Sequence, residues 1–282
     1  MSKLKFLVVS VCVLSFISAA CNAGDSNLAG VNGAVLELSS WDKNSSTWKQ
    51  VIFTKNNLSF NLYGDGANDS VGVGINSNSL APNRKYALLQ RTVFGVLEDG
   101  QKVTQTEKTY CDFVSMETGC VLLSRPADAC SGSWKDGEWS TDVGETIRPE
   151  LETISPDALI QSVVGNSDAK LRALAIKDQM FMGEYSYMSC YPPQKHVRSL
   201  NDLGFYLAQG GYDSSALNIY RAIEAVGERA VLMLNIADSL WNMGENAEAL
   251  QHYKQYSDMM NAEGKGSKVP VRVFQRIKIA NP

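Results

Sequence analysis

The pattern of hydrophobic and polar positions changes about halfway along the chain. Between residues 24 and 150, short apolar or alternating runs such as "WKQVIFTK" and "LSFNLYG" are separated by clusters of Asn, Gly, Asp and Ser. Such runs are typical of β-strands joined by turns. After residue 150 the apolar residues recur at helical spacing instead. The sequence therefore predicts an α+β protein, with an N-terminal antiparallel β-domain (a sandwich or a small barrel) followed by C-terminal α-helical hairpins.

The clearest pair of strands lies in "RTVFGVLEDGQKVTQTEKTY", residues 91–110. Asp99 and Gly100 stand between two arms rich in Val, Thr, Phe and Tyr, residue types that suit a pleated, half-buried surface. Glycine readily adopts the positive φ that tight hairpin turns require. We therefore expect a β-hairpin here.

The helical part begins soon after residue 150. Ser155 can cap the free amides of a helix, and Pro156 suits its first position. Pro192 and Pro193 offer no amide donor and end this region. We expect residues 151–195 to form a helical connector, in which "MGEYSYM" is a candidate degenerate copy of the later "MGENAEA".

Two segments of the remaining module, residues 196–282, repeat at a constant offset. Gly244 follows Gly211 by 33 residues, and the same offset relates Leu203 to Ile236, Leu207 to Leu240, Ala216 to Ala249, and Tyr220 to Tyr253. The glycines permit a tight turn between two antiparallel helices. The alanines let those helices approach closely, and the tyrosines lie four residues later on the same helical face. The spacing therefore predicts two packed helical hairpins.

Residues 202–256 resemble the tetratricopeptide repeat family, whose 34-residue units are helix–turn–helix hairpins. In that family the first helix of each unit lines a concave surface that holds a peptide or a partner helix. The resemblance implies a partner-binding surface made by residues of both units: Arg198, Asn201, Phe205 and Gln209 from the first, and Asp238, Trp241 and Asn242 from the second. The two aromatic residues would be its anchors. The alternative is that they are buried against a neighbouring helix or the β-domain.

The first residues carry a targeting pattern. Lys3 and Lys5 precede an apolar run, residues 6–17, which small residues follow. This is the order of a secretory signal peptide, so we expect residues 1–23 to be removed on export. Cleavage before Cys21 would instead leave a lipidated N-terminus, because "ISAAC" resembles a bacterial lipobox. The bacterial periplasm or an outer-membrane anchor is the expected location, with secretion as the alternative.

Four cysteines remain whichever cut is made: Cys111, Cys120, Cys130 and Cys190. In an oxidising compartment they predict two disulfides, for which three connectivities exist. We favour nearest-neighbour pairing, Cys111 with Cys120 and Cys130 with Cys190. The second bond would tie the β-domain to the helices.

Charge restricts the choice of partners. Without the two lysines of the signal, 24 of the 26 basic residues remain against 30 acidic ones, a net charge of −6. We find no basic stripe, so nucleic acid and anionic membranes are poor candidate partners. Membrane contact is expected only through an N-terminal lipid.

Catalytic patterns are thin. The chain has two histidines and lacks HExxH, GxSxG and CxxC motifs. We therefore expect no metal, no cofactor and no enzymatic activity. The leading hypothesis is an exported adaptor or inhibitor-like protein that binds another protein through its concave surface.

Two alternatives remain, both in "SWKDGEWSTD". Trp134 and Trp139 could bind a glycan or a small ligand in the cell envelope, and Asp136 and Glu138 could serve a hydrolase as general acid and base.

Near the C-terminus, "VPVRVFQRI" has an apolar pattern that fits either a helix or a strand.

Overall fold

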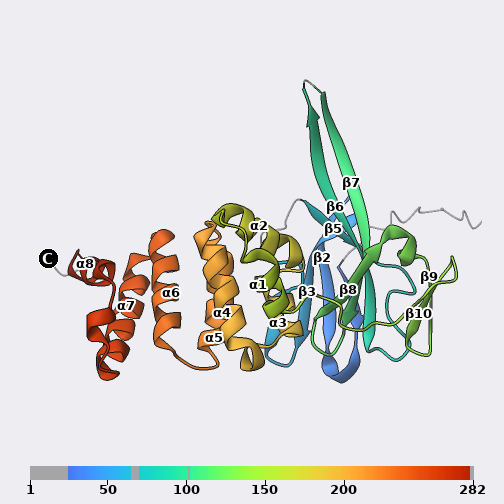
Figure 1. Cartoon of the computed structure of the whole chain (residues 1–282). Coiled ribbons are helices and arrows are strands. Elements are labelled where there is room, and N and C mark those ends of the chain that lie inside the picture. The colour runs from blue at the N-terminus through green and yellow to red at the C-terminus, as the bar shows by residue number, and fades with distance from the viewer. Residues whose placement is uncertain (1–24, 65–69, 101, 280–282) are drawn as a thin grey trace, which may run out of the picture.

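The structure is a computed structural model that describes residues 25–64, 70–100 and 102–279. The β-structure lies at one end, and the helices extend from it in a row towards the C-terminus (Figure 1). The predicted signal peptide, residues 1–23, and the candidate lipidation site Cys21 lie outside the described residues. The predicted order, β-structure followed by helices, is confirmed.

Eight antiparallel strands form the main sheet in the order β1-β2-β3-β5-β6-β7-β8, with β4 paired to β3. A smaller sheet has the order β11-β10-β9. Among the described residues β1 and β8 do not pair, so the sheet is open and the small-barrel alternative is wrong. The strands are β1 Ser26–Ala29, β2 Val35–Asp42, β3 Thr47–Lys55, β4 Leu58–Asn61, β5 Val71–Gly74, β6 Tyr86–Asp99, β7 Lys102–Ser115, β8 Val121–Pro126, β9 Gly132–Lys135, β10 Glu138–Thr141 and β11 Thr146–Ile147.

The predicted hairpin is confirmed and is much longer than its neighbours. β5 pairs with β6 only as far as Val93, and β8 pairs with β7 only from Tyr110 onward. β6 and β7 continue to pair with each other up to Asp99 and Lys102. Residues 94–100 and 102–108 therefore project from the sheet as a two-stranded ribbon (Figure 1).

The helical part begins as expected, because the Ser155 hydroxyl accepts a hydrogen bond from the amide of Ala158. "VPVRVFQRI" contributes to a helix, α8, which settles the open choice. The α-helices are α1 Pro156–Val163, α2 Ala169–Gln179, α3 Glu184–Cys190, α4 Pro193–Gln209, α5 Asp213–Glu224, α6 Ala230–Asn242, α7 Asn246–Ala262 and α8 Val271–Ile279, and the short 3-10 helices are Val31–Gly33, Ala127–Cys130 and Gly266–Lys268.

Two helical hairpins, α4–α5 and α6–α7, correspond to the two repeated segments. Their turns contain Gly211 and Gly244, whose φ values of 87° and 84° favour glycine. The four residues assigned to helix packing are at most 1% exposed: Ala216, Tyr220, Ala249 and Tyr253. The predicted packing role of these residues is confirmed.

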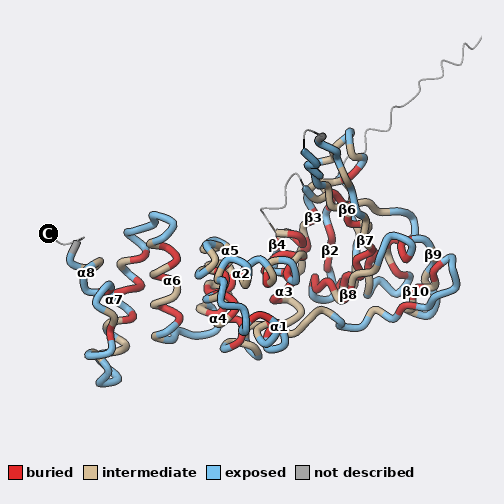
Figure 2. Tube along the Cα trace, turned by 45° about the horizontal axis from the view of Figure 1, so that its top comes forward, coloured by how far each residue is buried: buried red, intermediate tan, exposed pale blue. Residues whose placement is uncertain are grey.

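A continuous hydrophobic core joins the sheet to the helices, and buried residues run from one part into the other (Figure 2). At their junction Arg91 forms a buried ion pair with Asp112, with 2.6 Å between Nε and Oδ2. Phe181, in the connection between α2 and α3, places its ring 4.2 Å from the Arg91 guanidinium. The helices are therefore fixed to the sheet by side-chain packing as well as by covalent bonds.

The described residues contain two disulfides, but the favoured nearest-neighbour pairing is wrong. The bonds join Cys111 to Cys130 and Cys120 to Cys190. Cys111 lies opposite Arg125 in the ladder of β7 and β8, whereas Cys120 lies beside the turn that joins them. Four residues of strand, about 13 Å, separate the two positions, too far for a disulfide. Cys120 instead links the sheet to the end of α3, so one bond does tie the β-domain to the helices.

Candidate partner-binding groove

A hollow of about 310 Å³ lies between α4 and α6, the first helices of the two hairpins. We call it the α4–α6 groove. Four residues of the predicted binding surface line it: Phe205, Gln209, Asp238 and Asn242. Other lining residues are Asp213, Tyr220, Asn235, Ser239, Arg272 and Arg276.

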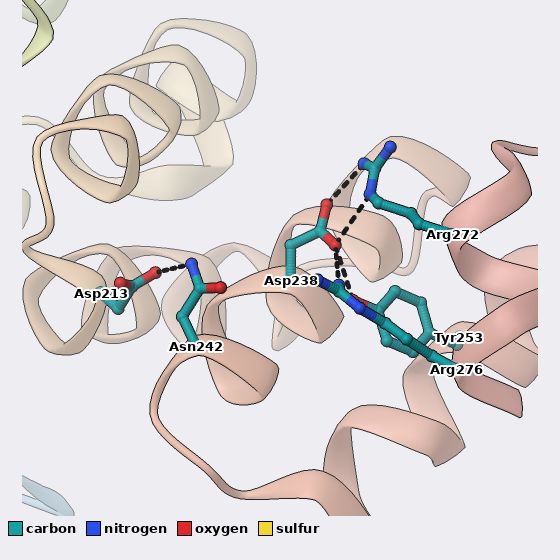
Figure 3. A network of polar contacts seen from close by, with 6 residues as sticks. All are labelled: Asp213, Asp238, Asn242, Tyr253, Arg272 and Arg276. Carbon is teal, nitrogen blue, oxygen red and sulfur yellow. Dashed lines mark hydrogen bonds and ion pairs between the residues drawn. The ribbon is translucent and has the colours of Figure 1, made fainter. Parts of the chain in front are cut away.

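Asp238 is the centre of a charged network at one end of the groove (Figure 3). Its carboxylate oxygens lie 2.6 Å from Arg272 Nη2 and 2.7 Å from Arg276 Nη1, and both arginines belong to α8. The Tyr253 hydroxyl donates to Asp238 Oδ1 at 2.6 Å and itself accepts from Arg276. Burial alone would raise the pKa of Asp238, but the hydrogen bonds from Arg272 and Tyr253 and the two positive charges outweigh it and lower this pKa. Asp238 is therefore ionised at neutral pH and holds α8 in place.

Trp241 belongs to the same attachment and does not line the groove. Its ring centroid lies 4.9 Å from the Arg276 guanidinium and 6.3 Å from the ring of Tyr253. These are distances of cation–π and aromatic packing. The structure therefore places Trp241 beside α8, whereas Phe205 is 43% exposed at the edge of the groove.

The opposite end of the groove is polar. Asn242 Nδ2 donates to Asp213 Oδ1 at 3.2 Å (Figure 3). Gln209 Oε1 accepts from Arg172 of α2 at 2.7 Å. Ser239 is buried, and its hydroxyl has no hydrogen-bond partner in the part of the chain that the structure describes. Hydrogen-bonding capacity thus remains beside the hollow.

The two other predicted residues lie outside the groove. Asn201 accepts a hydrogen bond at 3.1 Å from Nδ2 of Asn235, a residue that lines the hollow. Arg198 is exposed on α4 and does not line the hollow. Asn235 precedes Asp238 by three residues and Ser239 by four, and Ser239 precedes Asn242 by three, so helical spacing from the predicted residues would have found both.

The tryptophans of the alternative site pack against each other. Trp139 is fully buried, and its indole Nε1 donates to the carbonyl of Ala129 at 2.8 Å. Trp134 Nε1 donates to the carbonyl of Asn78 at 2.8 Å, and the two rings meet edge-on at 5.2 Å. This loop does not present the open aromatic surface on which a sugar stacks.

Within residues 25–64, 70–100 and 102–279, no group of three or more His, Cys, Asp or Glu side chains is placed to hold a metal ion. No helix in these ranges has the length and apolar character needed to span a membrane.

Comparisons with protein-family models, with curated proteins and with solved structures found no match to this chain. The function of the chain is therefore inferred from its sequence and from the geometry of the groove.

Proposed function

We propose that this chain is an exported, non-enzymatic interaction protein that holds a segment of a partner protein in the α4–α6 groove. One observation carries the proposal: four residues that the tetratricopeptide resemblance assigns to a concave binding surface line a single hollow. On this proposal α4–α5 and α6–α7 are repeat units of that type. Export is supported by the two disulfides and by the signal-like first residues.

The groove suits a peptide or one face of a partner helix. Its volume of about 310 Å³ is at the small end of the range for ligand pockets, enough for a few side chains. Phe205 offers an exposed aromatic surface, and such residues commonly dominate binding energy. The ends differ in charge, with Asp213 at one and two arginines against one carboxylate at the other. A bound segment would therefore have a preferred direction.

The test compares two phenylalanines on the helical part. Phe205→Ala removes the groove's aromatic surface, and Phe274→Ala, on α8, removes a similarly exposed ring that does not line the groove. Affinity purification from the native cell envelope, followed by mass spectrometry, should recover a partner with the parent protein and with the Phe274 variant. The Phe205 variant should bind the purified partner at least about tenfold more weakly by calorimetry.

Trp241→Ala is a poorer test, because Trp241 packs beside α8 and its loss would loosen that helix. Equal recovery of the partner by the Phe205 variant, or recovery of no partner by any form, would contradict the proposal.

A further inference from the structure

One face of the β6–β7 ribbon carries exposed apolar side chains among acidic and polar ones. Side chains alternate between the two faces of a strand, so Phe94, Val96 and Glu98 share a face with the residues paired to them: Glu107, Gln105 and Val103. Val96 is 58% exposed and Val103 is 66% exposed. An isolated two-stranded ribbon has few contacts to stabilise it, so exposed valines along it are an unfavourable feature unless something covers them.

This face borders a hollow at the base of the ribbon. The hollow has a volume of about 730 Å³ and lies between the ribbon and the turn that joins β2 to β3. Phe94, Val96 and Glu107 line it from the ribbon, and Asp42 and Lys49 line it from the turn region. The ribbon face and the turn therefore form one corner in which an extended segment can lie.

Among the described residues, no strand pairs with the edge of β6 beside this corner beyond Phe94. The amide of Phe94 donates to the carbonyl of Ser70 at 2.7 Å, so Phe94 directs its backbone polar groups away from β7. Because the direction of the backbone N–H and C=O groups alternates from residue to residue along a strand, those of Val96 and Glu98 also point away from β7. Neither has a backbone partner on that side within the described residues. A strand added to β6 would satisfy these groups.

The charges indicate what kind of strand fits. Asp42, Glu98 and Glu107 are acidic, and Lys49 already lies 3.7 Å from Asp42 and over the ring of Phe94. No basic residue occurs between 92 and 99, so pairing this edge with that of a second copy would bring acidic groups together. A basic segment is attracted to the same surface.

We infer that the ribbon is a second docking surface, distinct from the α4–α6 groove, for an extended segment of a partner protein. The segment adds as a strand to the open edge of β6. It places an aliphatic side chain opposite Val96 and a basic side chain opposite Glu98. Backbone hydrogen bonds supply affinity, and this pattern of side chains supplies specificity.

The probe is a short synthetic peptide labelled with a fluorophore. Every second residue of it is threonine, and the residues between are valine and lysine in turn. Fluorescence anisotropy with the intact protein should show binding that weakens as salt rises, because exposed ion pairs are screened. Glu98→Gln together with Glu107→Gln should weaken binding about fivefold. Val96→Pro removes the outward amide without touching the ladder to β7 and should abolish binding.

Matched controls separate this surface from others. Glu117→Gln together with Asp128→Asn makes the same charge change at exposed positions of the β-domain and should leave binding unchanged. Phe205→Ala, in the α4–α6 groove, should also leave it unchanged, so the two proposals fail independently. Circular dichroism checks that Val96→Pro is folded, and if it is not, the glutamine double variant decides alone.

Equal binding of a peptide with glutamate in place of lysine would overturn the inference. Binding unaffected by the glutamine double variant would overturn it too. Dimers of the protein alone that Val96→Pro dissociates would show that the edge binds a second copy.

Discussion

At the scale of single residues, one glycine decides how closely the first hairpin packs. A Cβ atom on Gly204 would lie 2.5 Å from the ring of Tyr220, which is 1% exposed and has no room to move. The position 33 residues later is Ala237, also buried. The first hairpin therefore depends on glycine where the second accepts a methyl group.

Gly204→Ala should destabilise the protein by about 1 kcal/mol. Overpacking a core costs about 1–3 kcal/mol, and the better helix propensity of alanine returns up to about 1 kcal/mol of it. Gly227→Ala is the matched control, because a Cβ atom there meets nothing within 4 Å. Urea unfolding of the two variants measures the difference, and equal midpoints would disprove the packing role.

The sequence could predict these packing residues because their roles are local. Helical spacing alone assigns the residues at positions 216, 220, 249 and 253 to a packed helix face, and all four are buried. Trp241 shows the limit of that reasoning. Its surroundings depend on Arg276, a residue of a helix that the sequence pattern did not separate from a strand.

At the scale of elements, α8 continues the packing of the repeats. Val269 and Val273 follow Ile236 and Leu240 by 33 residues, and all four are buried. Extending the offset would therefore have predicted this helix. Its alternating apolar residues hid the signal, because a short segment with such a pattern also fits a strand.

The attachment of α8 through Asp238 should be sensitive to acid. The pKa of Asp238 is lowered in the folded protein, so its contribution is fully present above the ordinary value of 3.8 and is lost as the pH falls below it. Asp238→Asn should lower protection of the α8 amides about fivefold at neutral pH, because a partly exposed charged network contributes about 1 kcal/mol.

Hydrogen exchange of residues 271–279, normalised for intrinsic rates, measures this effect between neutral pH and pH 3. Asp258→Asn, an exposed position on α7, is the control. Protection that is independent of pH in the parent protein, or unchanged in the Asp238 variant, would show that α8 is held by Val273 and its apolar neighbours instead.

At the scale of the whole molecule, the sequence predicts the order of the two parts but not how they join. Which cysteines meet depends on the register of β7 against β8, and register is set by pairing between strands that local patterns do not encode. The junction also uses Arg91, Asp112 and Phe181, which lie far apart in the sequence. Four of the residues that line the groove could be predicted, because the repeat brings them together. That β6 has no neighbour beyond Phe94 among the described residues could not be predicted, because it depends on where β5 begins.

The two disulfides should contribute unequally to stability. Cys120 and Cys190 are 70 residues apart and Cys111 and Cys130 only 19, so chain-entropy loss predicts contributions of about 4 and about 3 kcal/mol. Replacing each cysteine pair with alanines measures the contribution of each disulfide to stability. Alanine is chosen instead of serine because it buries no unpaired hydroxyl. Urea unfolding should show the larger loss for the Cys120–Cys190 variant, and peptide mapping without reductant should recover the remaining bond in each. An equal loss would mean that packing at Arg91 and Phe181, and not the covalent link, keeps the helices on the sheet.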